Sequence, residues 1–203
     1  MSTNYLGLQN YKKLSEKILS EFEGFSQHFS GFQVDQKLSC LSGCGKCCFK
    51  PDIFATPIEM LPLALEIIER GEGEAVYQKC LEHKNERCIF LKIDDEKNYK
   101  AHCGEYSHRP LICRTFGVSA RHNKLNKIEY SVCKMIKEEK KEEYAQLLSN
   151  TNIPVEDVPF IDFSRSHIAT IDPRFLEEEI HINEAMRKML EKLLMLNQYN
   201  LDS

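Results

Sequence analysis

Nine cysteines are the feature that most restricts how this chain can fold, and four of them fall within nine residues: Cys40, Cys44, Cys47 and Cys48. Thiolate is a soft ligand that suits Zn²⁺, Cu(I) and iron–sulfur clusters. Ligands on one short loop also meet an ion at a small cost in loop-closure entropy. The loop therefore predicts a metal site, around which the other segments of the chain would have to pack.

Length and charge narrow the class of protein. With 203 residues, the chain is long enough for one domain, residues 1–203, with an apolar core of its own. Such a chain needs no disulfides to fold, and its net charge of −4 gives no reason to expect nucleic acid as a partner. No apolar signal core opens the sequence, and no stretch approaches the roughly 18 apolar residues of a membrane span. We expect a cytoplasmic protein without membrane contact, whose thiols stay reduced.

Apolar residues at helical spacing predict a long helix at each end of the chain. Residues 1–39 should contain a helix that ends near Gly31, with an apolar face made of Tyr11, Leu14, Ile18, Phe22, Phe25 and Phe29. In the C-terminal helical extension, residues 134–203, Asp172 is the expected N-cap of a helix and Pro173 its first residue. The stripe of that helix is Ile182, Met186, Met189, Leu193 and Leu196. Such a stripe usually joins the core, and it would also suit a homodimer seam or a partner protein.

The segment between these helices has helical and strand-like parts. After a short strand at residues 53–55, Thr56-Pro57-Ile58-Glu59 is a capping box that begins a helix, and Gly71 ends that helix. A second helix at residues 74–83 contains Cys80, which we interpret as a small buried apolar residue. Further along, the composition predicts short strands at residues 89–91 and 128–132, a polar loop at 92–102, one charged helix at 134–148 and a connector at 153–159.

These patterns predict a predominantly helical α+β fold. A small, metal-stabilised, cysteine-rich core with short β strands, residues 40–133, would be flanked by the N- and C-terminal helices.

Four further cysteines lie in short motifs after the first loop: Cys88 in RCIFL, Cys103 in HCGEY, Cys113 in RPLICRTF and Cys133 in YSVC. Together with the first loop and the Thr-Pro-x-Glu helix start, these motifs resemble the CxxCxxCC, or YkgJ-type, cysteine-cluster family over about residues 40 to 133. One departure is the first gap of the loop, which has three residues here and two in the family motif. The resemblance implies a zinc- or iron-chelating protein.

The eight cysteines of these motifs exceed one simple site, because a tetrahedral Zn²⁺ takes four thiolates and a [4Fe–4S] cluster also takes four. Either two sites exist, or half of the cysteines are not ligands, or a thiolate bridges two metals. Adjacent Cys47 and Cys48 would point in different directions in an extended backbone, so they could serve different ions. Because four thiolates leave a zinc site negatively charged, we expect Arg109 and Arg114 beside the ligands, with Tyr106 in a structural role.

Two classes of function fit these residues. The first is a metal-binding cysteine-cluster protein, in which zinc or iron has a structural or metal-handling role. The second is an iron–sulfur redox protein or a cluster-dependent enzyme; similar cysteine clusters occur in flagellin lysine methylases, which links the motif to protein methylation by analogy. The chain lacks a Gly-rich nucleotide loop and the HExxH and GxSxG motifs, so we assign no catalytic residue. We favour Zn²⁺ over Fe or [4Fe–4S], because zinc needs no assembly machinery and suits a closed site.

Overall fold

The longest described element is helix α1 (Leu8–Asp35) of the computed structural model, which describes residues 7–173 and 177–198. Its apolar spacing produces a buried face, as predicted, that includes Tyr11, Ile18, Phe22 and Phe29. The prediction that α1 ends near Gly31 is wrong. A single glycine costs a helix only about 0.5–1 kcal/mol, and the next residue, Phe32, is buried, so the helix continues to Asp35.

Three more helices pack with α1 around the main apolar core: α2 (Leu61–Glu69), α3 (Gly73–Glu82) and α8 (Ile182–Gln198). The predicted capping box is present before α2, on a 3₁₀ turn, η2 (Pro57–Met60). Gly71 follows α2 with a φ of 74°, as its role as helix stop requires. Every residue of the predicted α8 stripe is buried, so this face is core and the chain itself covers it.

The predicted start of the last helix is wrong, because α8 begins at Ile182 and not at Pro173. Strand β6 (Ile180–His181) precedes α8 directly and pairs antiparallel with β1 (Phe54–Ala55). The N–H of Ile182 also donates a hydrogen bond of 2.9 Å to the carbonyl oxygen of Ile53. Pairing with a distant strand therefore sets the start of this helix, and local capping residues do not.

Two antiparallel hairpins are the other sheets of the described chain: β2 (Leu91–Asp95) with β3 (Lys100–Cys103), and β4 (Val118–His122) with β5 (Ile128–Val132). The first hairpin corrects the predicted polar loop at residues 92–102. Apolar and polar residues alternate over only four residues in each strand, 91–94 and 100–103, and most side chains of β2 are exposed, so the strand signal in the sequence is weak. The carboxylate of Asp95 accepts hydrogen bonds from the backbone and side chain of Asn98, which closes the turn.

The single charged helix predicted for residues 134–148 is two helices, α5 (Lys134–Glu139) and α6 (Lys141–Ser149). Lys140 breaks the helix with φ −121° and ψ 56°. The break lets both Ile136 and Leu147 enter a second apolar cluster, which also contains Phe32 and Val132. Burial on two short helices thus outweighs the continuous helix that the charge pattern favours.

Shorter elements connect these parts: the helix α4 (Leu111–Arg114) and the 3₁₀ turns η1 (Lys46–Phe49), η3 (Tyr106–His108) and η4 (Val155–Asp157). Helix α7 (Ile161–Thr170) follows the predicted connector and is not indicated by the sequence pattern. Only Ser164 and Ile168 of α7 are buried, so its apolar face is too narrow for the spacing to show.

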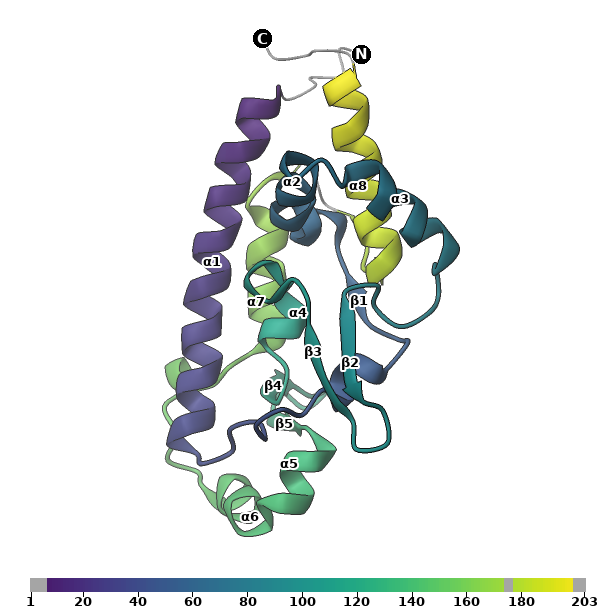
Figure 1. Ribbon diagram of the computed structural model, residues 1–203. Helices are drawn as coiled ribbons and strands as arrows, with labels where there is room; N and C mark the ends of the chain where they lie inside the picture. The colour runs from purple at the N-terminus through teal and green to yellow at the C-terminus, as the bar shows by residue number, and fades with distance from the viewer. Residues whose placement is uncertain (1–6, 174–176, 199–203) are drawn as a thin grey trace.

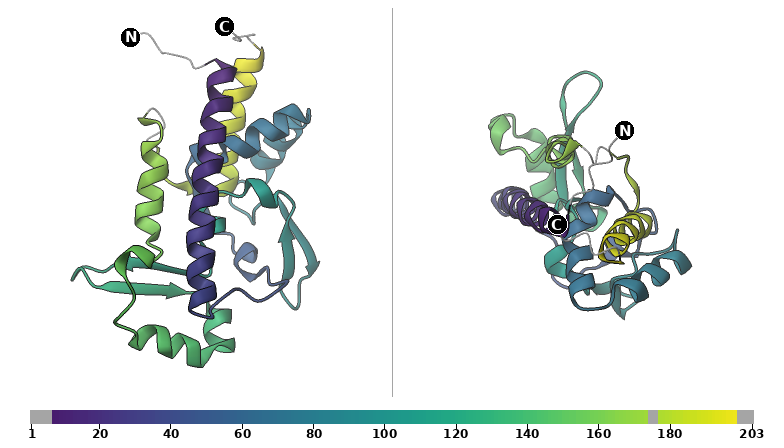
Figure 2. Two further views of the ribbon diagram at one scale, coloured as in Figure 1. Left: turned by 90° about the vertical axis from the view of Figure 1, so that its left-hand side faces the viewer. Right: turned by 90° about the horizontal axis from the view of Figure 1, so that it is seen from above.

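The elements form a predominantly helical α+β fold, as predicted. The start of α1 and the end of α8 lie at one end of the molecule, and α5 and α6 lie at the opposite end (Figure 1). Hairpins β2–β3 and β4–β5 extend on opposite sides of the lower half of α1 (Figure 2, left). No helix within residues 7–173 and 177–198 has the length and hydropathy needed to cross a bilayer.

Candidate metal centre

Eight of the nine cysteines line one cavity of about 800 Å³: Cys40, Cys44, Cys47, Cys48, Cys88, Cys103, Cys113 and Cys133. All of them are free thiols, and they come from segments almost a hundred residues apart. The ninth, Cys80, lies on α3 in the main core, and burial raises its pKa to about 12. The prediction that Cys80 is a buried apolar residue is confirmed.

The first cysteine loop lies along the edge of β3. The backbone of Cys44 pairs with Lys100, and the N–H of Gly45 donates a hydrogen bond of 2.9 Å to the carbonyl oxygen of Tyr99. A Cβ at Gly45 would lie 2.6 Å from the Cβ of Ala101, so only glycine fits this approach. The loop can thus place turn η1, with Cys47 and Cys48, against the hairpin.

Cys88 and Cys103 lie at the base of hairpin β2–β3. Leu91 pairs with Cys103 across the hairpin, and its N–H donates a hydrogen bond of 3.0 Å to the carbonyl oxygen of Cys88. Both neighbours of Cys88 are held by Asn183 of α8, a buried residue that the sequence analysis missed. Its side-chain oxygen accepts from the N–H of Ile89 at 3.1 Å, and its amide nitrogen donates to the carbonyl oxygen of Arg87 at 3.1 Å.

Cys113 lies on α4, whose first residue is fixed by Glu59 of the capping box. One carboxylate oxygen of Glu59 accepts hydrogen bonds from the backbone and hydroxyl of Thr56, and the other accepts one from the N–H of Leu111 at 3.0 Å. Burial raises the pKa of Glu59 despite these donors. The sequence shows the capping box, but it does not show that the same carboxylate reaches across to α4.

Cys133 is the N-cap of α5, and its N–H donates a hydrogen bond of 2.7 Å to the carbonyl oxygen of Gly117. Two lysines connect α5 and the residue after it to the first cysteine loop. The amine of Lys46 lies 3.3 Å from the sulfur of Met135, and the amine of Lys140 donates a hydrogen bond of 3.1 Å to the carbonyl oxygen of Ser39. These contacts join the segments that carry Cys40 and Cys47 to the segment that carries Cys133.

The two arginines that the sequence singles out have different surroundings. The guanidinium of Arg109 lies 3.5 Å from the ring centroid of Tyr106 and donates a hydrogen bond of 3.3 Å to the carbonyl oxygen of Cys113. Its charge lowers the pKa values of the Cys103 and Cys113 thiols against the larger effect of burial. Arg114 instead donates to the carbonyl oxygens of Arg109 and Ser107 and to the hydroxyl of Ser26 on α1. Arg114 therefore ties the loop before α4 to α1.

Burial governs the acidity of the cavity thiols. It raises the pKa of Cys88 to about 11 and is also the main cause of the raised pKa values of Cys103 and Cys113. Cys47 and Cys48 differ, because their Sγ atoms lie 3.8 Å apart and share a hydrogen bond. That bond raises the pKa of Cys47 and lowers the pKa of Cys48.

The donor set of the cavity fits a metal that prefers sulfur. Thiolates are the ligands of structural zinc and of iron–sulfur clusters, and the cavity wall supplies eight thiols. Within the described part of the chain, however, no three His, Cys, Asp or Glu side chains already lie close enough together to hold one ion. A change of χ1 rotamer moves a cysteine sulfur by roughly 3 Å. Rotation of the thiols is therefore the adjustment that metal binding would require first.

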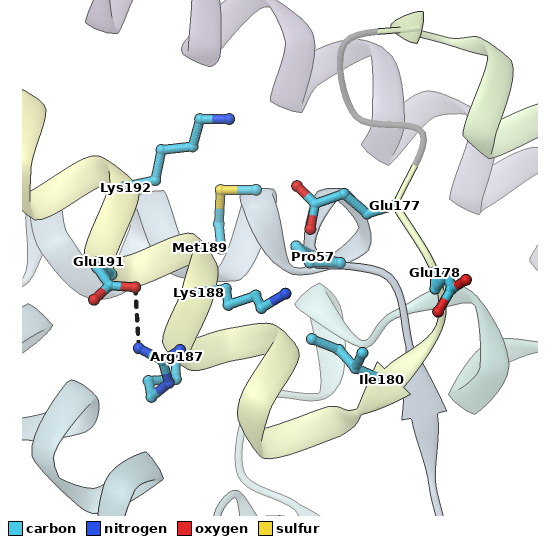
Figure 3. Close-up of a pocket in the computed structure, with 9 residues that line it drawn as sticks. All are labelled: Pro57, Glu177, Glu178, Ile180, Arg187, Lys188, Met189, Glu191 and Lys192. Carbon is cyan, nitrogen blue, oxygen red and sulfur yellow. Dashed lines mark hydrogen bonds and ion pairs between the residues drawn. The ribbon is translucent and has the colours of Figure 1, made fainter.

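A second cavity, of about 570 Å³, lies between α8 and the residues before β6 (Figure 3). Three acidic and three basic side chains line it, and no cysteine does: Glu177, Glu178, Glu191, Arg187, Lys188 and Lys192. Arg187 is already paired with Glu191 at 3.0 Å and with Glu184 at 2.8 Å. This balanced set of charges does not suggest a reaction or a metal.

The fold and the first cavity define a cysteine-cluster protein. Comparison with protein families matches residues 39–147 to the CxxCxxCC family, whose description proposes a zinc- or iron-chelating domain. The match includes more than half of the chain and all eight cavity cysteines, and the chain belongs to this family. Comparison with curated proteins and comparison with solved structures each found no match.

Proposed function

We propose that the protein binds zinc through the thiolates of its cavity cysteines, in a structural or metal-handling role. The observation that carries this proposal is the selective grouping of the thiols: eight line one cavity, and the ninth is buried elsewhere. Sets of thiolates are typical of closed structural zinc sites. The proposal includes a reducing compartment such as the cytoplasm, where the thiols stay available to metal.

The charges around the cavity support bound thiolates. Among the described residues, its charged lining includes Lys50, Arg109 and Arg114, and the carboxylate of Asp52. Arg165 and Glu179 also line the cavity, but they form an ion pair of 2.9 Å and offset each other. The lining is therefore positive in a protein whose net charge is −4, which favours ligands in their anionic form.

The position of the cavity supports a structural role. Cys88 and Cys113 pack against the main core, whereas Cys133 packs against the second core. An ion held by cysteines of both groups, or by two neighbouring sites, would connect the two cores. Binding energy at such a site contributes directly to folding.

Iron is the second candidate, and the size of the cavity is the observation that favours it. About 800 Å³ is more space than one ion needs, and a [4Fe–4S] cluster also takes four thiolates. An iron–sulfur protein would remain a member of the same family, whose description includes iron. A homodimer through the α8 stripe is not part of either proposal, because the chain covers that face.

The proposal is tested by adding Zn²⁺ to reduced, metal-free protein under anaerobic conditions and following thermal unfolding. We expect the midpoint temperature to rise with Zn²⁺ until the sites are filled, because the metal binds the folded state. The Cys80→Ser variant should bind the same amount of Zn²⁺, although loss of a buried sulfur lowers its stability. A midpoint that does not change with Zn²⁺ and no binding by equilibrium dialysis would refute the proposal.

A further inference from the structure

We propose that the cavity holds two separate four-thiolate sites, one formed by Cys40, Cys44, Cys47 and Cys133 and the other by Cys48, Cys88, Cys103 and Cys113. The inference rests on the proposed function, since it divides the thiols of that same cavity between two ions. It commits to one of the three arrangements that eight cysteines allow.

The first set is gathered by contacts around α5. The Lys140 amine holds the carbonyl oxygen of Ser39, directly before Cys40, and the Lys46 amine contacts Met135, two residues after Cys133. Cys133 packs against the second apolar core. The charges follow the same grouping, because Cys40 interacts electrostatically with Cys44, Cys47 and Cys133.

The second set is gathered around the base of hairpin β2–β3 and the main core. Cys88 is bonded through its carbonyl oxygen to Leu91, the cross-strand partner of Cys103. Both Cys88 and Cys113 pack against the main core. The largest electrostatic interactions of Cys48 beyond the adjacent Cys47 are with Cys113, Cys103 and Cys88.

The two sets meet at Cys47 and Cys48 in turn η1. Successive side chains of a 3₁₀ turn point about 120° apart, so two adjacent cysteines can serve two different ions. Their Sγ atoms are nevertheless 3.8 Å apart, and Cys113 also interacts weakly with Cys47. A metal cluster bridged through this pair is therefore the arrangement that an experiment has to exclude.

Double variants separate these arrangements. Because three thiolates can still hold an ion weakly, each variant removes two: Cys40→Ser with Cys133→Ser in the first set, Cys88→Ser with Cys103→Ser in the second, and Cys133→Ser with Cys103→Ser across the sets. Zinc is measured by elemental analysis after dialysis against a competing chelator, and far-UV circular dichroism reports folding. We expect about two equivalents in the unchanged protein and about one in each within-set variant. The mixed variant leaves three thiolates in each set, so both of its sites should hold zinc weakly and lose it at a lower chelator concentration than the unchanged protein does.

Other outcomes overturn the partition. Complete loss of zinc in both within-set variants indicates one bridged cluster. Complete loss in one variant and no loss in the other indicates a single site. Unchanged protein that binds no metal would instead contradict the proposed function itself. If a variant fails to fold, alkylation of the unchanged protein loaded with about one equivalent of zinc separates the arrangements by mass spectrometry. Two separate sites should protect the four thiols of one set together, whereas a bridged cluster would protect thiols of both sets and a single site would protect the same four thiols at any zinc level.

Discussion

The side-chain oxygen of Asn183 on α8 accepts a hydrogen bond from the backbone N–H of Ile89, 94 residues earlier, at 3.1 Å. The amide nitrogen of Asn183 donates to the carbonyl oxygens of His83 and Arg87 at 2.7 and 3.1 Å. One buried amide thus fixes the backbone on both sides of Cys88. A helix that carries no candidate ligand thereby positions a cysteine of the cavity.

Replacing Asn183 by alanine should destabilise the protein by about 1–3 kcal/mol, because buried backbone groups lose their partners. Urea unfolding measures this change. Gln78→Ala is the matched control, since it removes an exposed side-chain amide that bonds only to Glu74, and it should stay within about 0.5 kcal/mol of the unchanged protein. Equal effects of the two substitutions would show that the Asn183 contacts do not contribute.

Replacing Gly45 by alanine should separate the first cysteine loop from β3. The added Cβ would meet Ala101 at 2.6 Å, and such overpacking costs about 1–3 kcal/mol. We expect lower stability and weaker Zn²⁺ binding, measured by unfolding and by competition with a chelator. Gly31→Ala in α1 has open space around its new Cβ and should instead stabilise the helix by about 0.5–1 kcal/mol. Unchanged zinc affinity in Gly45→Ala would argue against the close approach.

Replacing Arg109 by glutamine should weaken metal binding about 10- to 100-fold, the usual effect of removing a group that supports metal ligands. Its guanidinium contacts the carbonyl oxygen of Cys113, and its charge partly offsets the burial that raises the pKa values of Cys103 and Cys113. Arg121→Gln is the control, because Arg121 is exposed on β4 and pairs with Glu129. Zinc competition that gives the same affinity for both variants would exclude Arg109 from this role.

The stability of the protein should depend on pH through Glu59, whose pKa burial raises in the folded state. A raised folded-state pKa contributes stability that is fully present below the unfolded value, about 4.3, and is lost as pH rises through the folded-state pKa. The advantage of Glu59 over the Glu59→Gln variant should therefore be largest at acid pH and decrease as the pH rises. Urea unfolding with a chelator present, over a series of pH values, measures this difference. An advantage that grows with pH would contradict the assignment.

The parts of the fold that depend on neighbouring residues could be predicted from the sequence, whereas the parts that depend on long-range contacts could not. The face of α1, the capping box at Thr56 and the strand at residues 128–132 were readable, because each is set by residues next to one another in sequence. The start of α8 and the break at Lys140 were not, since a distant strand and a second core determine them. Hairpin β2–β3 was missed because the apolar alternation of each strand lasts only four residues and most side chains of β2 are exposed.

In the candidate site, too, local sequence indicated some features, and distant contacts determined the others. Cysteine spacing and motifs indicated all eight thiols that line the cavity, and the isolated position of Cys80 in a helix indicated its burial. The groups that position the thiols, such as Asn183 and Lys140, were not predictable, because a single polar residue in or beside a helix gives no signal of a partner some hundred residues away. Whether the eight cysteines ligate stays a prediction.

Elemental analysis together with a visible absorption spectrum, on protein purified without air, shows which metal the cavity thiols hold and how much of it. We expect a colourless protein with about two equivalents of zinc, one for each set of four thiolates. Iron with sulfide and a brown charge-transfer band would show that the sites hold iron–sulfur clusters and not zinc. Folded protein that contains no metal, takes up none, and leaves all eight cavity thiols open to alkylation would contradict the account.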